Sequence, residues 1–176
     1  MENNINTKIK KIIKLSFLLI SAYYFYLISN NPLEYSIVHS IHLVFHEAGH
    51  PTFGLLGIQF LQMAGGTIMQ LLIPLVFIYY FFSKRDIYST AFIILWLASS
   101  FFDVAAYAKD AILMNLDLLG GDNAIHDWNY LLSTLGVLKY TAQISSSIYF
   151  LGIVSLVSGL AIGIYDLFFN KEVDTV

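Results

Sequence analysis

Five stretches of this 176-residue chain are apolar enough to cross a lipid bilayer, and they constrain the fold more than any other feature. A spanning helix needs about 20 mostly apolar residues to cross a hydrocarbon core about 30 Å thick. Backbone groups in that core must be hydrogen-bonded within the protein, which favours helices. We therefore predict an all-α integral membrane protein, a bundle of about five transmembrane helices over residues 12–29, 36–56, 66–82, 87–113 and 144–169.

The remaining segments add little beyond this bundle. Residues 115–140 are more polar, and residues 126–135 predict a short interfacial helix before the last span. No linker divides the chain, so residues 1–176 are predicted to form one transmembrane domain. A net charge of −3, with no basic cluster interleaved with aromatic residues, argues against nucleic acid as a partner. Because the chain has no cysteine, a metal ion must be bound by His, Asp or Glu.

Lysines precede the first span, and cytoplasmic flanks of membrane proteins are enriched in Lys and Arg. The sequence therefore predicts a multi-pass protein with a cytoplasmic N-terminus. With five crossings, the basic residues on the cytoplasmic side would be Lys8, Lys10, Lys11, Lys14, Lys109 and Lys139, against Lys84, Arg85 and Lys171 on the other side.

The second span contains a metal-binding pattern, His46-Glu47-Ala48-Gly49-His50. On a helix, two histidines four residues apart share a face and can bind one zinc ion, with the glutamate as general base. His46 follows Ser36 by ten residues, or about 15 Å of helix, which predicts a position near mid-membrane. Ionisable residues at that depth are costly and mark function. The pattern therefore predicts metal-dependent hydrolysis.

Two further histidines, His39 and His42, lie on the same helical face as His46 and His50. They belong to no motif, and we expect them to line a cavity or to hydrogen-bond a neighbouring helix. Pro51 predicts a kink or a helix end just after His50.

A catalytic zinc site usually has three protein ligands, so a third must come from elsewhere in the chain. The first candidate is Asp103, the deeper carboxylate of the fourth span, which shares a face with Tyr107 and Asp110. The rival is His126, which precedes Asp127 in the interfacial segment. Asp127 could also serve as the N-cap of the short helix. We regard Asp127, Tyr107, Asp110 and His42 as possible accessory residues.

These elements resemble the site-2-protease-like intramembrane zinc metalloproteases, in particular their small bacterial members. That family carries His-Glu-x-x-His on one transmembrane helix, Gly-Pro-x-x-Asn at the start of another, and a downstream aspartate in a Leu-Asp-Gly context. Here the first element is intact at residues 46–50. The second reads Gly66-Thr67-Ile68-Met69-Gln70, with glutamine in place of asparagine, and the third reads Phe102-Asp103-Val104 without the leucine and glycine. The resemblance covers residues 38–109.

The resemblance implies Zn²⁺ as cofactor and transmembrane segments or signal-peptide remnants as substrates within the lipid bilayer. It also implies that Gly66 and Gln70 bind the substrate strand. Two alternatives stay open. One is a membrane metallohydrolase acting on a lipid amide or ester, which a role for His126 as ligand would favour. The other is a non-catalytic metal-binding or ion-conducting protein, in which the four histidines line a path.

Overall fold

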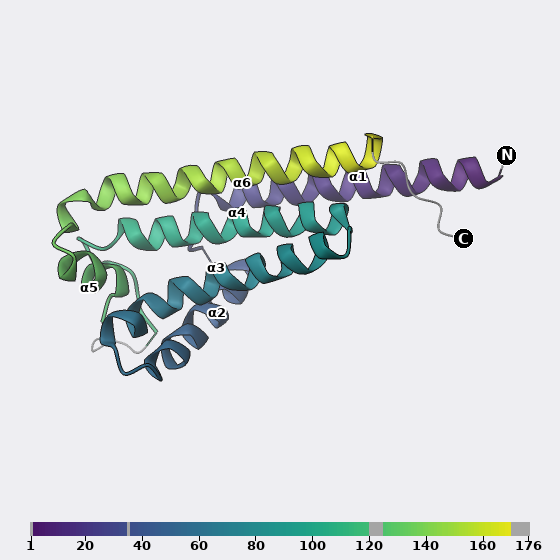
Figure 1. The fold of residues 1–176 in the computed structure, drawn as a ribbon. Helices are drawn as coiled ribbons and strands as arrows, with labels where there is room; N and C mark the ends of the chain where they lie inside the picture. Colours follow the sequence, from purple (N-terminus) through teal and green to yellow (C-terminus); the bar gives the residue numbers. More distant parts are fainter. Residues whose placement is uncertain (1, 35, 120–124, 170–176) are drawn as a thin grey trace.

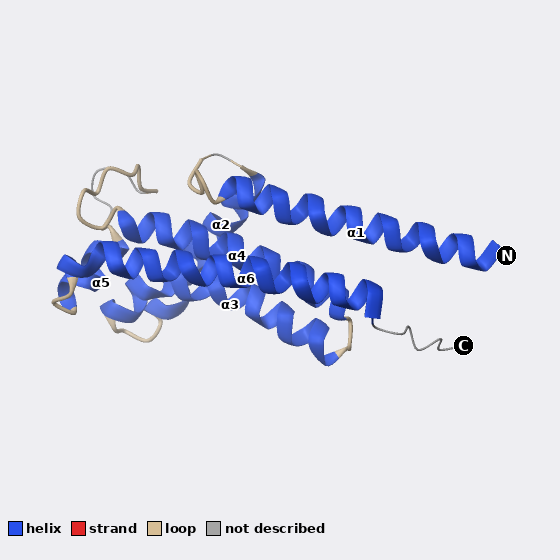
Figure 2. Ribbon diagram, turned by 90° about the horizontal axis from the view of Figure 1, so that it is seen from above, coloured by secondary structure: helices blue, strands red, loops and turns tan. Residues whose placement is uncertain are grey.

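The computed structural model describes residues 2–34, 36–119 and 125–169, and all regular structure in these ranges is helical (Figure 2). The predicted all-α bundle is therefore confirmed. The elements, in chain order, are α1 (Glu2–Ile28), α2 (Ile37–Gly54), α3 (Gln59–Ser83), α4 (Ile87–Lys109), α5 (Asp127–Thr134), the short 3-10 helix η2 (Leu138–Tyr140) and α6 (Thr141–Phe169).

Among the described residues, four helices are long and apolar enough to cross a membrane: α1 from Ile5, α3, α4, and α6 together with η2. This is consistent with an integral membrane protein. The remaining predicted span, residues 36–56, corresponds to α2, which lies outside this set because four histidines and a glutamate lower its mean hydropathy. The predicted interfacial helix corresponds to α5.

Helix α3 begins seven residues earlier than the predicted third span, because residues 59–65 form its first two turns. The chain turns just before it, where Gly57 adopts a φ of 70° that favours glycine. Helix α2 continues through Pro51 and ends at Gly54, so the helix end predicted after His50 falls one turn later.

Glycines allow α2 to pack closely against the first half of α3. A Cβ atom on Gly49 would overlap the backbone carbonyl of Gly65, and one on Gly66 would overlap the imidazole ring of His46. The glycines of the predicted substrate element thus bring α3 directly under the metal-binding face of α2. This contact sets the position of His46 and His50.

Helix α2 does not extend along the whole bundle (Figure 1). Its polar partners on α3 are Gln62 and Gln70, both in the first half of that helix, and Phe45 contacts Trp96 near the middle of α4. The His46 ring contacts Tyr107, two residues before the end of α4, at a centroid distance of 5.6 Å. The site therefore lies near one end of the bundle.

Helix α4 forms the centre of the bundle and packs antiparallel to α6. Gly152 of α6 leaves room for the ring of Phe102, and Gly159 leaves room for Leu95. Leu95 also packs against Leu18 and Phe25 of α1. These contacts fix α4, which carries Asp103 and Tyr107, relative to the other spans.

We predict that Gly49→Ala separates α2 from α3. The free energy of unfolding should fall by about 1–3 kcal/mol or more, the usual cost of overpacking. The measurement is thermal unfolding in detergent. The control is Gly54→Ala on the same helix, because its Cβ would contact only the Gln62 side chain, at 3.5 Å. Alanine favours helix over glycine, so Gly54→Ala should be neutral or slightly stabilising. Equal effects of the two variants would contradict the close packing of α2 on α3.

Candidate metal centre

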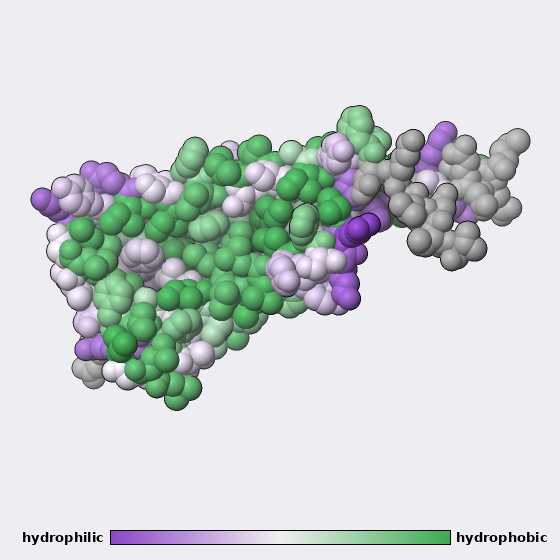
Figure 3. Space-filling view, in the orientation of Figure 1, coloured by the Kyte–Doolittle hydropathy of each residue, from purple (hydrophilic) through white to green (hydrophobic). Residues whose placement is uncertain are grey.

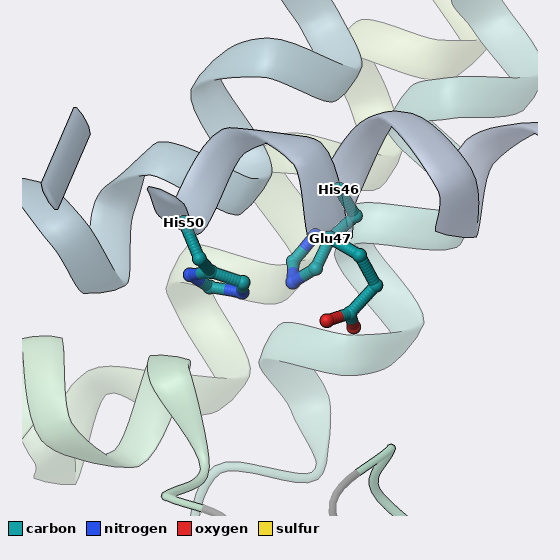
Figure 4. A group of neighbouring side chains, drawn as sticks. All are labelled: His46, Glu47 and His50. Carbon is teal, nitrogen blue, oxygen red and sulfur yellow. The ribbon is translucent and has the colours of Figure 1, made fainter. Parts of the chain in front are cut away.

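His46, Glu47 and His50 project from one side of α2 (Figure 4). Each offers one ligand atom, and these atoms lie within 4.8 Å of one another, close enough for one metal ion. The two imidazole rings are neighbours, with centroids 5.0 Å apart. The pairing predicted from their four-residue spacing is therefore present in the structure.

Asp127, the first residue of α5, lies between the two histidines. Its Oδ2 atom is 2.9 Å from Nε2 of His46 and 3.3 Å from Nε2 of His50. Burial acts to raise the pKa of the Asp127 carboxyl, but the hydrogen bonds to His46 and His50 outweigh it, so the pKa lies below its ordinary value. An ionised carboxylate thus faces both Nε2 atoms.

The Nδ1 atom of each histidine faces a carbonyl oxygen. Nδ1 of His50 is 2.9 Å from the backbone oxygen of Gln62, and Nδ1 of His46 is 3.3 Å from Oε1 of Gln70. A carbonyl oxygen can only accept a hydrogen bond, so in both rings Nδ1 carries the proton. The lone pairs of the neutral rings are then on the Nε2 atoms that converge on Asp127. This second-shell arrangement is typical of zinc-binding histidines.

Asp103 fixes the orientation of the Gln70 amide. Gln70 Nε2 donates to Asp103 Oδ2 at 2.6 Å, so its Oε1 atom faces His46. The other Asp103 oxygen accepts from Nδ1 of His39 at 2.8 Å. Asp103 therefore acts on His46 through Gln70, and a contact with His46 or His50 is absent from its hydrogen bonds and ion pairs among the described residues.

These partners suit a bound cation. Without one, each of His46 and His50 lies between two acceptors, and satisfying both requires two imidazolium ions side by side. Like charges so close in a buried site repel. A divalent cation bound by both Nε2 atoms and Asp127 removes this conflict. Tetrahedral zinc with bonds of about 2.0–2.2 Å places its ligand atoms roughly 3.3 Å apart, close to the two distances found here.

The carboxylate that lies against both histidines is Asp127, whereas the sequence favoured Asp103 as the third ligand with His126 as rival. His126 points away from the metal-binding pair. Its Nδ1 atom accepts the backbone N–H of Asn129 and so caps α5, and its Nε2 atom lies 3.4 Å from Asp110, outside hydrogen-bond geometry. Burial lowers the pKa of His126, with Asp110 acting in the opposite direction. Because His126 serves as the cap, Asp127 is not needed for that role.

The remaining accessory candidates have structural partners. Asp110 accepts backbone N–H groups of Asn115 and Leu116, both at 3.1 Å, and so shapes the segment after α4. His42 is buried, and its Nε2 atom accepts from the Trp96 indole at 3.2 Å. Nδ1 of His42 therefore carries the proton and faces Asp103 Oδ2 at 3.5 Å, so this nitrogen is not available to bind a metal.

A cavity of about 520 Å³ lies beside the metal-binding residues. Its polar side includes Glu47, Asp127, Tyr107 and His39. The cavity is also lined by apolar side chains, which include Leu33, Leu43, Met63, Val104, Leu116 and Ile125. Such a cavity fits an apolar molecule that presents one polar group to the metal-binding residues.

The two aspartates can be distinguished by zinc affinity, measured in detergent against a competing chelator. Asp103→Asn should weaken zinc binding by about 10–100-fold, the range for second-shell changes, because it loosens Gln70 and His46. Asp127→Asn should weaken zinc binding by more than about 100-fold, since it removes the negative charge of a proposed ligand. A larger loss for Asp103→Asn than for Asp127→Asn would contradict the assignment of Asp127 as ligand.

Comparison of this chain with protein-family models, with curated proteins and with solved structures gives no match.

Proposed function

We propose that this protein is a membrane-embedded, zinc-dependent hydrolase, and that it cleaves peptide bonds in transmembrane segments or signal-peptide remnants. The observation that carries the proposal is the convergence of His46 Nε2, His50 Nε2 and the Asp127 carboxylate next to Glu47. The four apolar helices support a multi-pass location in the membrane, with a cytoplasmic N-terminus as part of the proposal.

The chemistry follows from the residues around this point. Bound zinc would supply a water molecule that deprotonates near neutral pH and would polarise a carbonyl oxygen. Glu47 lines the cavity and would accept the water proton and pass it to the leaving group. Tyr107 accepts the backbone N–H of Asp127 through its hydroxyl, at 3.2 Å. Its own O–H can then donate to the substrate carbonyl oxygen as negative charge develops there.

Two observations support a peptide substrate. The segment of residues 66–70, which resembles the substrate-binding element of the metalloproteases, lies directly beside the metal-binding pair: Gly66 packs under the His46 ring and Gln70 contacts its Nδ1 atom. In this structure Gln70 orients His46, a different role from the substrate contact that the resemblance implied. The aliphatic cavity walls suit the side chains of a transmembrane segment.

A lipid amide or ester is the second candidate substrate. The position of the site near the end of α4, beside the short helix α5, favours it, because the ester and amide bonds of lipids lie close to the headgroups. A role for His126 as metal ligand would also favour a lipid substrate, but His126 instead caps α5.

Glu47→Gln tests whether the site is catalytic. We expect this variant to keep bound zinc and to lose about 10²–10⁴-fold in turnover, the usual contribution of a general base. The assay uses the zinc-loaded full chain in vesicles with a labelled transmembrane peptide, and products are identified by mass spectrometry. The control is Glu34→Gln, which changes an exposed glutamate outside the cavity-lining residues and should retain activity.

Several outcomes would reject the protease proposal. Release of fatty acid or lysolipid from the vesicle lipids, without peptide cleavage, would identify the lipid hydrolase instead. If Glu47→Gln leaves metal binding or ion conduction unchanged and the parent protein cleaves neither substrate, the protein is a binding or ion-conducting protein. The glutamate would then have no chemical role.

A further inference from the structure

The charged residues are distributed unequally between the two ends of the bundle. At one end, Lys14 of α1 lies against the first turn of α4: its Nζ atom is 5.1 Å from the ring centroid of Tyr88, whose hydroxyl donates to the Lys14 backbone oxygen at 2.7 Å. Tyr88 follows Lys84 and Arg85 of the α3–α4 turn by only a few residues. We call this the basic end; its described basic residues are Lys8, Lys10, Lys11, Lys14, Lys84 and Arg85.

The opposite end, which contains the metal centre, has the reverse composition. Among the described residues its basic side chains are Lys109 and Lys139. Its acidic side chains are more numerous: Glu34, Glu47, Asp103, Asp110, Asp117 and Asp127. From Ile5 onward, the described acidic residues at the basic end are Asp86 and Asp166. Figure 3 shows hydrophobic side chains over the middle of one face and hydrophilic side chains gathered toward the ends.

This distribution follows from the path of the chain. Helix α1 runs from the basic end toward the metal centre, α3 returns to the basic end, α4 runs back, and α6 returns again (Figure 1). Because α2 occupies only the half of the bundle with the metal centre, it adds no crossing. The sequence placed Lys84 and Arg85 opposite the N-terminal lysines on the assumption that α2 crosses. The structure corrects this assignment and places them at the same end.

We infer that the basic end faces the cytoplasm and that the metal centre opens toward the non-cytoplasmic side of the membrane. Lys and Arg are enriched on the cytoplasmic side of membrane proteins, where they also contact the anionic headgroups of that leaflet. Six basic residues stand at one end against two at the other. Exposed Lys84 and Arg85 lie in a short turn, the type of connection in which this bias acts.

The inference narrows the substrate class, and this part rests on the proposed hydrolase. Tyr107 is two residues, or about 3 Å of helix, from the end of α4 and contacts His46. A transmembrane segment in the cavity would therefore present the bonds of its non-cytoplasmic half to the site. The substrates would be membrane-anchored segments cut near their non-cytoplasmic end.

The absence of cysteine from the chain allows a direct test of sidedness that needs no activity. Ser83→Cys places one thiol at the basic end and Ser133→Cys places one on α5, and both serines are exposed. The full-length variants are expressed in bacterial spheroplasts and treated with a membrane-impermeant maleimide, before and after permeabilisation. The cysteine-free parent protein serves as the unlabelled control.

Labelling of Ser133→Cys in intact spheroplasts, with Ser83→Cys labelled only after permeabilisation, is the expected result. Labelling of Ser83→Cys in intact spheroplasts would overturn the orientation. Labelling of Ser133→Cys only after permeabilisation would overturn it as well.

The cleavage position tests the consequence for the substrate. A single-pass peptide with lysines on one flank orients itself by the same charge bias, and the cut should fall in the half away from those lysines. Cleavage in the lysine-flanked half would overturn the inferred substrate class. Absence of cleavage with the expected labelling pattern would instead reject the proposed hydrolase and leave the orientation intact.

Discussion

The candidate metal centre has one electrostatic requirement. Positive charge must lie between the His46 and His50 rings and the Asp127 carboxylate. Each imidazole already uses its Nδ1–H toward a carbonyl oxygen, and both turn Nε2 toward one carboxylate oxygen. Two neutral rings leave Nε2 lone pairs facing a carboxylate, and two charged rings repel. A divalent cation bound between them would satisfy all of these atoms together. The close α2–α3 packing and the capped start of α5 both serve to hold this arrangement.

The role of Asp103 shows how a polar residue deep in a helix can act at a distance. It accepts from His39 and from Gln70, and Gln70 in turn sets the tautomer of His46. Burial of a carboxylate is costly unless its oxygens are hydrogen-bonded, and these donors meet that need. A position that in the sequence resembles a metal ligand thus orients, through Gln70, one of the candidate metal-binding histidines. Asp127 lies against both histidines, while the neighbouring His126 caps α5.

Several features could be predicted from the sequence, because they depend on local patterns. Apolar length predicts the helices, and the four-residue spacing of His46 and His50 places both on one face of α2. The start of α3 could not be predicted in this way. Gly65 and Gly66 are typical of a bend in isolation, yet they are helical here because α2 packs against them. Only the packing partner explains why glycine is needed inside that helix.

The sequence by itself determined the helical class of the chain, its apolar character and the pair of histidines with Glu47, since each depends on residues within a turn or a span of one another. The tertiary structure decided which carboxylate meets that pair, because Asp127 is 77 residues from His50 along the chain and reaches it only through the position of α5. It also decided that Lys84 and Arg85 share an end with Lys14. It also decided that helix α2, which packs against α3 and α4, covers only part of the length of the bundle.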